Sequence, residues 1–458
     1  MFIISRPLLK QLWLSLVASL AFFIIGMVRG YSASAIPSME ILDPELIQTS
    51  EQKSWIGSIP PLGAFTGSLA SGKVMQALGR RRALQLTAPA WLGAWLLLGF
   101  GGILPLLLLG RFLTGVCVGL VLAPGQVYVS ECCNPEIRGR LGSMPSIAMC
   151  LGILVSYVTG NWLNWRHLAL FSGLFCVALF VFLLPLPESP VWLEAHGADA
   201  SQAVKWLQLS AHATDRDPNK EDDKDSSLFN REVFFSARVL KPLTIVIVLL
   251  IFQQFSGIDA VIFFTVEIFK SAGSALAPGW AAVVVGVVQA LGAVGAAAAA
   301  DGTGRRLPLL ASAATCAAAN AAMGAAFYFR VDNHPWLGYL PIGSLVVFVA
   351  GYSLGLGALP FVLLGELFPA RHRAPLAALA GALNLLSMFA VIKSYHALES
   401  VMTSAGTFWM YSCFCVLAFM FVLFAVPETK GKSLAEIEQH FRGNKGHTVN
   451  KQTVTTPC

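Results

Sequence analysis

The chain has 458 residues, of which 56% are hydrophobic and only 12% are charged, and its formal net charge is +6. A soluble globular domain carries about 25% charged residues, so a chain this apolar could not cover its surface in water, and a soluble class is excluded. The nine cysteines show no spacing typical of a metal site. We therefore expect an integral membrane protein that uses no cofactor.

Apolar stretches long enough to cross a bilayer, about 20 residues each, recur twelve times along the chain. Six precede a charged central segment, at 11–28, 54–72, 83–110, 112–130, 141–165 and 167–187. Six follow it, at 242–258 (continuing to about 269), 271–300, 307–329, 333–365, 374–392 (continuing to about 398) and 400–427. This pattern predicts an all-α integral membrane fold with twelve transmembrane helices in two pseudo-symmetric six-helix bundles.

The same pattern divides the chain into four parts. We expect an N-terminal bundle at 1–187, a central loop with short helices at 188–238, a C-terminal bundle at 239–427 and a tail at 428–458. Arginines and lysines gather in alternate loops, whereas the first intervening loop is acidic. Because cytoplasmic loops carry an excess of basic residues, both termini and the central loop are expected to face the cytoplasm.

Short motifs in the first half recur in the second at a nearly constant offset. Gly79-Arg80-Arg81 matches Gly304-Arg305-Arg306, and Glu131 followed by Arg138 matches Glu366 followed by Arg373. Such repeated halves often form a transport site at mid-membrane between two rocking bundles. Basic residues alone could merely orient helices, but that would not explain glutamates at matched spacing. We predict a cytoplasmic gating network formed by Arg80, Arg81, Glu131, Arg138, Arg305, Arg306, Glu366 and Arg373.

Several polar side chains fall deep within the predicted spans. A polar group far from either membrane surface costs free energy unless it is paired or hydrated, so it marks a candidate site. The candidates are Gln253, Gln254, Asp259, Gln289 and Asn384. Amides suit sugars because each offers donors and acceptors to neutral hydroxyls. The alternative is that they only bond neighbouring helices.

The chain also carries a series of motifs in family order. They are GRR at 79–81, GRFLTGVCVGL at 110–120, LPLPESPVWL at 184–193, QQFSGIDAVIFFT at 253–265, DGTGRR at 301–306, GELFPARHR at 365–373 and VPETKGKS at 426–433. By these motifs the chain resembles the sugar porter family of the major facilitator superfamily. YSASAIPSM, LGSMPS and FTVEIFKSAGS make it most similar to arthropod facilitated trehalose transporters and class III facilitative glucose transporters.

The resemblance implies roles for further residues. Gln253, Gln254 and Gln289 would contact the sugar, and Phe361 occupies the family's usual tryptophan position, where its ring would pack on a sugar. Phe263 and Phe264 resemble the family's external gate aromatics. For all three phenylalanines, simple packing is the alternative.

Two further positions bear on the site. Ser146 stands where many glucose transporters carry a glutamine, whereas trehalose-type members are small and polar there. Gly355, Gly357 and Pro360 would break the tenth helix near its middle and allow its external half to bend.

Proton-coupled sugar porters carry an aspartate where this chain has Val28, which favours a facilitative uniporter of trehalose or of a hexose such as glucose. The neighbouring Arg29 could lie in the cavity, pair with an acid or snorkel to a surface. Asp259 keeps a proton-coupled symporter open as an alternative. A non-transporting sugar sensor is the second.

An enzyme is not expected, because no G-x-S-x-G, H-E-x-x-H or paired intramembrane catalytic acids occur. The arginine-rich loops are explained by topology, so no nucleic-acid partner is expected. The expected partners are a small-molecule sugar and the lipid bilayer, and we expect the chain to work as a monomer. The expected location is the cell membrane, as a multi-pass protein, with an endosomal or lysosomal membrane as the alternative.

Overall fold

The computed structural model describes residues 6–209, 237–299, 304–329, 338–368, 373–428 and 430. Most of the charged central segment, the tail beyond 430 and the side chain of Arg373 lie outside the described residues. No prediction made for them is therefore tested by the structure.

The first half contains six long helices. They are α1 (Arg6–Leu42), α2 (Ser50–Leu78), α3 (Arg80–Phe100), α4 (Leu104–Cys132), α5 (Pro135–Thr159) and α6 (Trp165–Leu183). Two short helices follow, α7 (Pro190–Ala195) and α8 (Ser201–Leu207). The side-chain amide of Gln11 donates to the carbonyl of Leu207 over 3.0 Å, which fixes α8 beside the start of α1.

The second half is built from broken and fused helices. They are α10 (Ala237–Phe255), α11 (Ile258–Ser271), α12 (Pro278–Ala299), α13 (Arg306–Tyr328), α14 (Leu340–Leu354), α15 (Leu359–Leu367) and α16 (Arg373–Ala425). α10 with α11 forms one membrane span, and α14 with α15 forms another. α16 contains two spans joined at Thr403, whose φ of 66° interrupts the helix. Together with the less apolar α2, the described residues account for the twelve predicted crossings.

Two predicted boundaries are wrong, both where a charged residue marks the expected end of a span: the first span does not end at 28 but continues to Leu42, and the boundary between the third and fourth spans is also misplaced. The apolar stretches predict a third span that ends near Arg111, but the structure turns earlier, at Gly101–Ile103, and Arg111 lies inside α4. Its guanidinium is fully buried and donates to the carbonyls of Ile56 and Val28 and to Ser32 Oγ, over 3.2, 3.1 and 2.5 Å. A charged side chain whose hydrogen bonds are made inside the bundle does not have to lie in a solvent-exposed loop.

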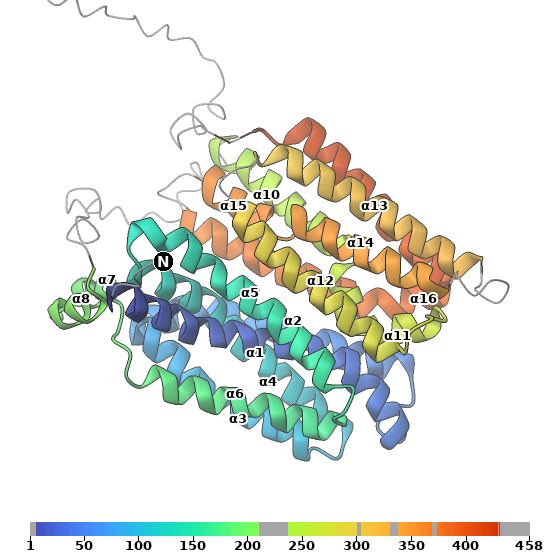
Figure 1. The fold of residues 1–458 in the computed structure, drawn as a ribbon, viewed down its shortest axis with the longest axis horizontal. Coiled ribbons are helices and arrows are strands. Elements are labelled where there is room, and N and C mark those ends of the chain that lie inside the picture. Colours follow the sequence, from blue (N-terminus) through green and yellow to red (C-terminus); the bar gives the residue numbers. More distant parts are fainter. Residues whose placement is uncertain are drawn as a thin grey trace, which may run out of the picture.

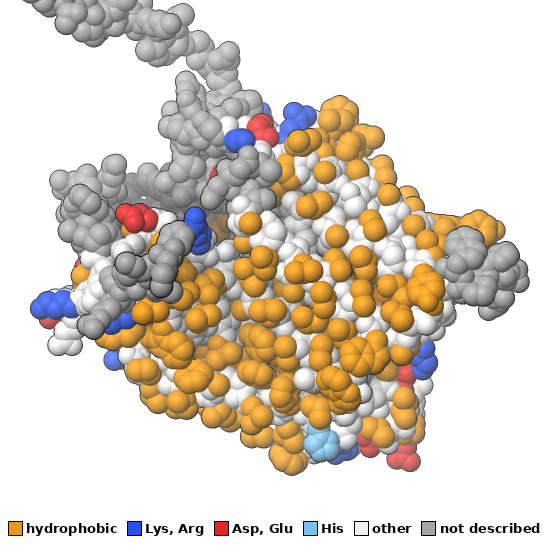
Figure 2. All heavy atoms as spheres, in the orientation of Figure 1, with side chains coloured by type: hydrophobic (Ala, Val, Ile, Leu, Met, Phe, Trp, Pro, Cys, Tyr) orange, Lys and Arg blue, Asp and Glu red, His pale blue; other side chains and the backbone are white. Residues whose placement is uncertain are grey.

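Small residues let the helices of the first half approach closely. A Cβ atom on Gly115 of α4 would lie 2.1 Å from the carbonyl oxygen of Pro60 on α2, and one on Gly152 of α5 would lie 2.0 Å from that of Phe23 on α1. Close backbone approach replaces the hydrophobic driving force that helices lack in lipid. The two halves lie side by side, the first coloured blue to green and the second yellow-green to red (Figure 1). Hydrophobic side chains cover most of the face between the two ends (Figure 2).

Candidate functional site

The break between α10 and α11 places three of the predicted site residues. Gly257 adopts a φ of +89°, and a Cβ atom there would lie 2.5 Å from the ring of Tyr411, so both conformation and space require glycine. The freed carbonyl of Ser256 accepts a hydrogen bond from Asn320 Nδ2 over 3.0 Å. The break is therefore stabilised by its neighbours, with Gln253 and Gln254 just before it.

A second break, between α14 and α15, lies against the first. Gln253 Nε2 donates to the carbonyls of Leu356 and Gly357 over 2.7 and 3.1 Å, and the backbone N–H of Leu356 donates to Ser312 Oγ over 3.0 Å. The predicted break of the tenth span at Gly355–Pro360 is thereby confirmed. Gln253 uses its donors to hold this unwound segment, and its role as a sugar ligand stays a prediction.

Gln254 and Gln289 differ from Gln253 because each keeps an unpaired acceptor. Gln254 Nε2 donates to Asn384 Oδ1 over 3.3 Å, and Asn384 Nδ2 donates to Gln253 Oε1 over 3.0 Å. Within the described residues, neither Gln254 Oε1 nor Gln289 Oε1 has a hydrogen-bond partner, although both side chains are buried. A buried acceptor without a donor costs about 1–3 kcal/mol, so both oxygens suit a ligand that brings hydroxyl groups.

Asp259 lies one residue beyond the start of α11 and pairs with Arg29 of α1. The pair joins the two halves, with exposed side-chain fractions of 1% for Asp259 and 19% for Arg29. Arg29 Nη1 also contacts Met149 Sδ of α5 at 3.7 Å. Of the three placements that the sequence left open for Arg29, the structure shows pairing with an acid.

Farther along α11, an aromatic cluster of the second half packs against α2 of the first half. The ring of Phe264 stacks on Tyr395 of α16, with centroids 5.2 Å apart, and meets His396 edge-on at 4.6 Å. A Cβ atom on Gly57 of α2 would lie 2.8 Å from Phe264 Cζ. Phe263 is equally buried. Gly57 thus gives the Phe264 ring room to seat against the opposite half.

Charged residues surround this cluster in a group that the sequence reading missed, here called the Lys53 network (Glu40, Lys53, Glu267, His396 and Glu399). Lys53 of α2 pairs with Glu40 of α1 and, at 3.3 Å, with Glu267 of α11. His396 lies 3.8 Å from Glu267 and 3.6 Å from Glu399. A further link across the halves runs from Ser54 Oγ to the carbonyl of Lys393 over 2.6 Å. The only sequence signal was the acidic loop beside an isolated lysine.

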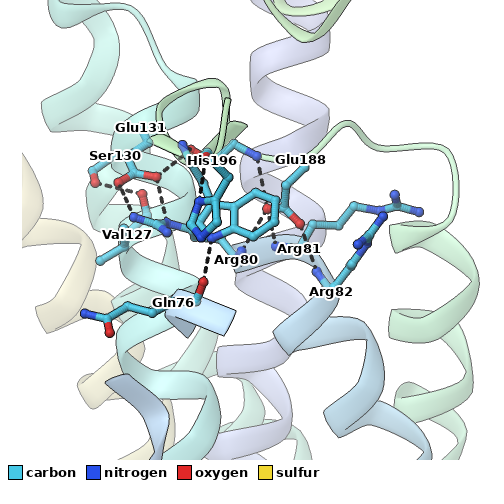
Figure 3. A network of polar contacts seen from close by, with 11 residues as sticks. Gln76, Arg80, Arg81, Arg82, Val127, Ser130, Glu131, Glu188 and His196 are labelled. Atoms are coloured by element: carbon cyan, nitrogen blue, oxygen red, sulfur yellow. Dashed lines mark hydrogen bonds and ion pairs between the residues drawn. The ribbon is translucent and has the colours of Figure 1, made fainter. Parts of the chain in front are cut away.

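The opposite end of the molecule, at the turn between α2 and α3, carries the predicted gating motifs (Figure 3). Arg80 donates twice to the Glu131 carboxylate, both times over 2.9 Å, and Ser189 Oγ donates to the same carboxylate over 2.5 Å. Glu188 accepts from the backbone N–H groups of Arg80 and Arg81, each over 2.8 Å, at the start of α3. A carboxylate there also complements the helix dipole.

The second half repeats this arrangement. Arg305 donates to Glu366 over 2.9 and 3.1 Å, and its backbone N–H donates to Glu428 over 2.9 Å. The backbone N–H of Arg306 donates to the other oxygen of Glu428 over 3.1 Å. These bonds each lie within one half. The structure thus pairs Arg80 with Glu131 and Arg305 with Glu366, and the gating role of the network stays a prediction.

Three predicted residues lie apart from these contacts. The guanidinium of Arg138 donates to the carbonyl of Cys133 over 3.2 Å. Ser146 on α5 is exposed, and Phe361 on α15 is 47% exposed. Their functional roles stay predictions.

Comparison with known proteins agrees with this architecture. Residues 14–441 match the family model described as Sugar (and other) transporter. The chain is 35% identical over 449 residues to the facilitated trehalose transporter Tret1-2 homolog of Drosophila sechellia, covering 95% of this chain and 91% of that protein. It is 33% identical to the facilitated trehalose transporter Tret1 of Polypedilum vanderplanki, covering 94% and 88%.

The fold is similar to a solved structure as well. The inward open conformation of the xylose transporter XylE from E. coli superimposes with a TM-score of 0.78 at 25% sequence identity. The match covers 93% of this chain and 98% of that one.

Proposed function

The chain belongs to the sugar porter family of the major facilitator superfamily, and from that premise we propose that it is a facilitative uniporter of trehalose or of a hexose such as glucose. As a family member it is a multi-pass membrane sugar transporter and not an enzyme. Three finer points are proposals: the identity of the sugar, the absence of coupling to protons and the residues that bind the sugar.

The observation that carries the proposal is the pair of buried amide oxygens on Gln254 and Gln289, which have no donor in the part of the chain that the structure describes. They lie on α10 and α12, and α12 packs against α5 of the other half. Neutral sugars present hydroxyl donors, which such acceptors can bind without any change of charge. The named activity of the trehalose-transporter relatives supports a disaccharide, and amides alone do not distinguish it from a hexose.

Alternating access is supported by where the halves touch. Among the described residues, the inter-half ion pairs and hydrogen bonds run from Arg29–Asp259 to the Lys53 network. By the rule that basic loops are cytoplasmic, the Arg80 end would face the cytoplasm. The molecule would then be closed on the outside and inward-facing, working as a monomer in the cell membrane.

The test is flux by the purified protein in liposomes. Labelled trehalose and labelled glucose are offered separately, with and without a pH gradient. A uniporter equilibrates one of them at the same final level in both conditions, whereas a symporter concentrates it when a proton gradient is applied. No saturable flux of either sugar would contradict the proposal and favour a sensor.

A further inference from the structure

The Asp259 carboxylate faces a physical difficulty inside the membrane. Its side chain is only 1% exposed, and a buried carboxylate must be neutralised by a proton or paired with a cation. The cation here is Arg29, which comes from α1 in the other half. The buried Arg29 Nε has no hydrogen-bond partner among the described residues, so the guanidinium retains a donor besides those on the acid.

We propose that Arg29 is a built-in counter-charge that takes the place of a transported proton. With Arg29 present, Asp259 is ionised and paired when the halves close over it, as in this structure, so the sugar moves without a proton. Without Arg29, the carboxylate is left buried and unpaired, and it must bind a proton for the site to remain neutral. The inference deepens the proposed uniport, on which it rests, by naming the residue that makes the carrier independent of protons.

The buried guanidinium of Arg111 also lies beside α1, but it donates to the carbonyls of Val28 and Ile56 and to Ser32 Oγ. Because those bonds occupy it, the groups around the pair leave this task to Arg29. Tyr157 and Cys150 of α5 and Tyr352 of α14 lie within electrostatic reach of the guanidinium, and none of them carries a positive charge. The helices α10 and α12, which pack against α11, carry the buried neutral amides Gln254 and Gln289.

The remaining titratable groups near α11 lie farther along it or at its start. On α16 they are Tyr411, which touches Gly257, and Tyr395 and His396, which touch Phe264. The Lys53 network, with the nearby Lys393, is centred on Glu267. At about 1.5 Å per residue, Glu267 lies about 12 Å beyond Asp259 along the helix. Its cation Lys53 is already paired with Glu40 and Glu267.

The test compares Arg29→Gln with Arg29→Lys, and with the double variant Arg29→Gln/Asp259→Asn, in liposomes held at equal pH on both sides. Wild type and Arg29→Lys should show sugar flux that varies less than about twofold between about pH 5.5 and 7.5. Flux by Arg29→Gln should fall on the order of tenfold at the higher pH and recover at the lower one, because a buried aspartate without a cation is tolerated only when a proton neutralises it. The double variant, whatever its rate, should lose this pH dependence.

Protonation is also measured directly, which separates this inference from the proposed function. Infrared difference spectra between the two pH values should show a protonated carboxyl band in Arg29→Gln that is missing from wild type and from the double variant. A flat pH profile in Arg29→Gln together with no carboxyl band would overturn the role of Arg29. If wild type carries no sugar while the band still appears, the uniport proposal fails but the counter-charge assignment stands.

Discussion

Gln253 of α10 donates a hydrogen bond to the main-chain carbonyl of Leu356, so that a side chain beside one helix break stabilises the break between α14 and α15. The same amide also reaches Gly357, and its oxygen accepts from Asn384. Three spans of the second half thus meet at one side chain. The neighbouring Gln254 is also buried, but its Oε1 has no donor among the described residues. Gln253 therefore stabilises the helix break, whereas Gln254 is the residue proposed to bind the sugar.

We expect Gln253→Leu to destabilise the protein. The substitution leaves the carbonyls of Leu356 and Gly357 buried without a donor, which costs about 1–3 kcal/mol. The measurement is the thermal unfolding midpoint of the purified protein in detergent. Gln254→Leu is the matched control, because it removes only one long bond to Asn384. If both variants lost the same stability, the assignment of Gln253 to structural support and of Gln254 to sugar binding would be contradicted.

Gln254→Ala should abolish most sugar flux while leaving the folded yield intact. Its Oε1 is the buried acceptor proposed to bind a hydroxyl, and a site that loses such a bond loses affinity by about 0.5–1.5 kcal/mol for a neutral partner. Substrate affinity and initial rate are measured in liposomes. Gln289→Ala should act in the same direction. Wild-type flux in the Gln254 variant would remove α10 from the site.

Much of this fold could be predicted because it depends on local composition. Apolar length gives the spans, and Gly355, Gly357 and Pro360 mark the break in the tenth span without reference to any other helix. Arg111 shows where that logic fails. From the sequence alone, a charged residue between apolar stretches predicts a loop. The structure shows that the Arg111 guanidinium instead donates to backbone carbonyls on α1 and α2.

The inter-half contacts were equally hidden in the sequence. Arg29 and Asp259 are far apart along the chain, as are Lys53 and Glu267, and their pairing depends on which ends of the bundles are closed. Hydropathy carries no information on that state. The internal repeat placed Arg80, Glu131, Arg305 and Glu366 in one predicted network, and the structure adds which of them pair.

Gly57→Leu should prevent closure at the Lys53 end. Even a Cβ atom there would lie 2.8 Å from the Phe264 ring, which Tyr395 holds from the other side. Transport should slow on the order of tenfold, equivalent to about 1.4 kcal/mol. Spin labels at Glu45 and Ala275, on opposite halves, should report longer distances than in the parent. Gly72→Leu on the same helix is the control, since a Cβ atom there meets nothing within 4 Å.

Glu131→Gln should slow transport more than it lowers stability. Arg80 and Glu131 are partly exposed, at 14% and 15%, and such a pair contributes about 0–1 kcal/mol on its own. The amide oxygen that remains still offers an acceptor to Ser189 Oγ, which ties the segment before α7 to α4, so the substitution chiefly removes the charge pair. Arg82→Gln is the control, because it removes a cation from the same turn. Within the described residues, the Arg82 backbone N–H makes a hydrogen bond, whereas the exposed guanidinium makes none. Unfolding midpoints and liposome flux are measured for both. If Arg82→Gln slows flux as much as Glu131→Gln does, then net charge at this end, and not the Arg80–Glu131 pair, controls the rate.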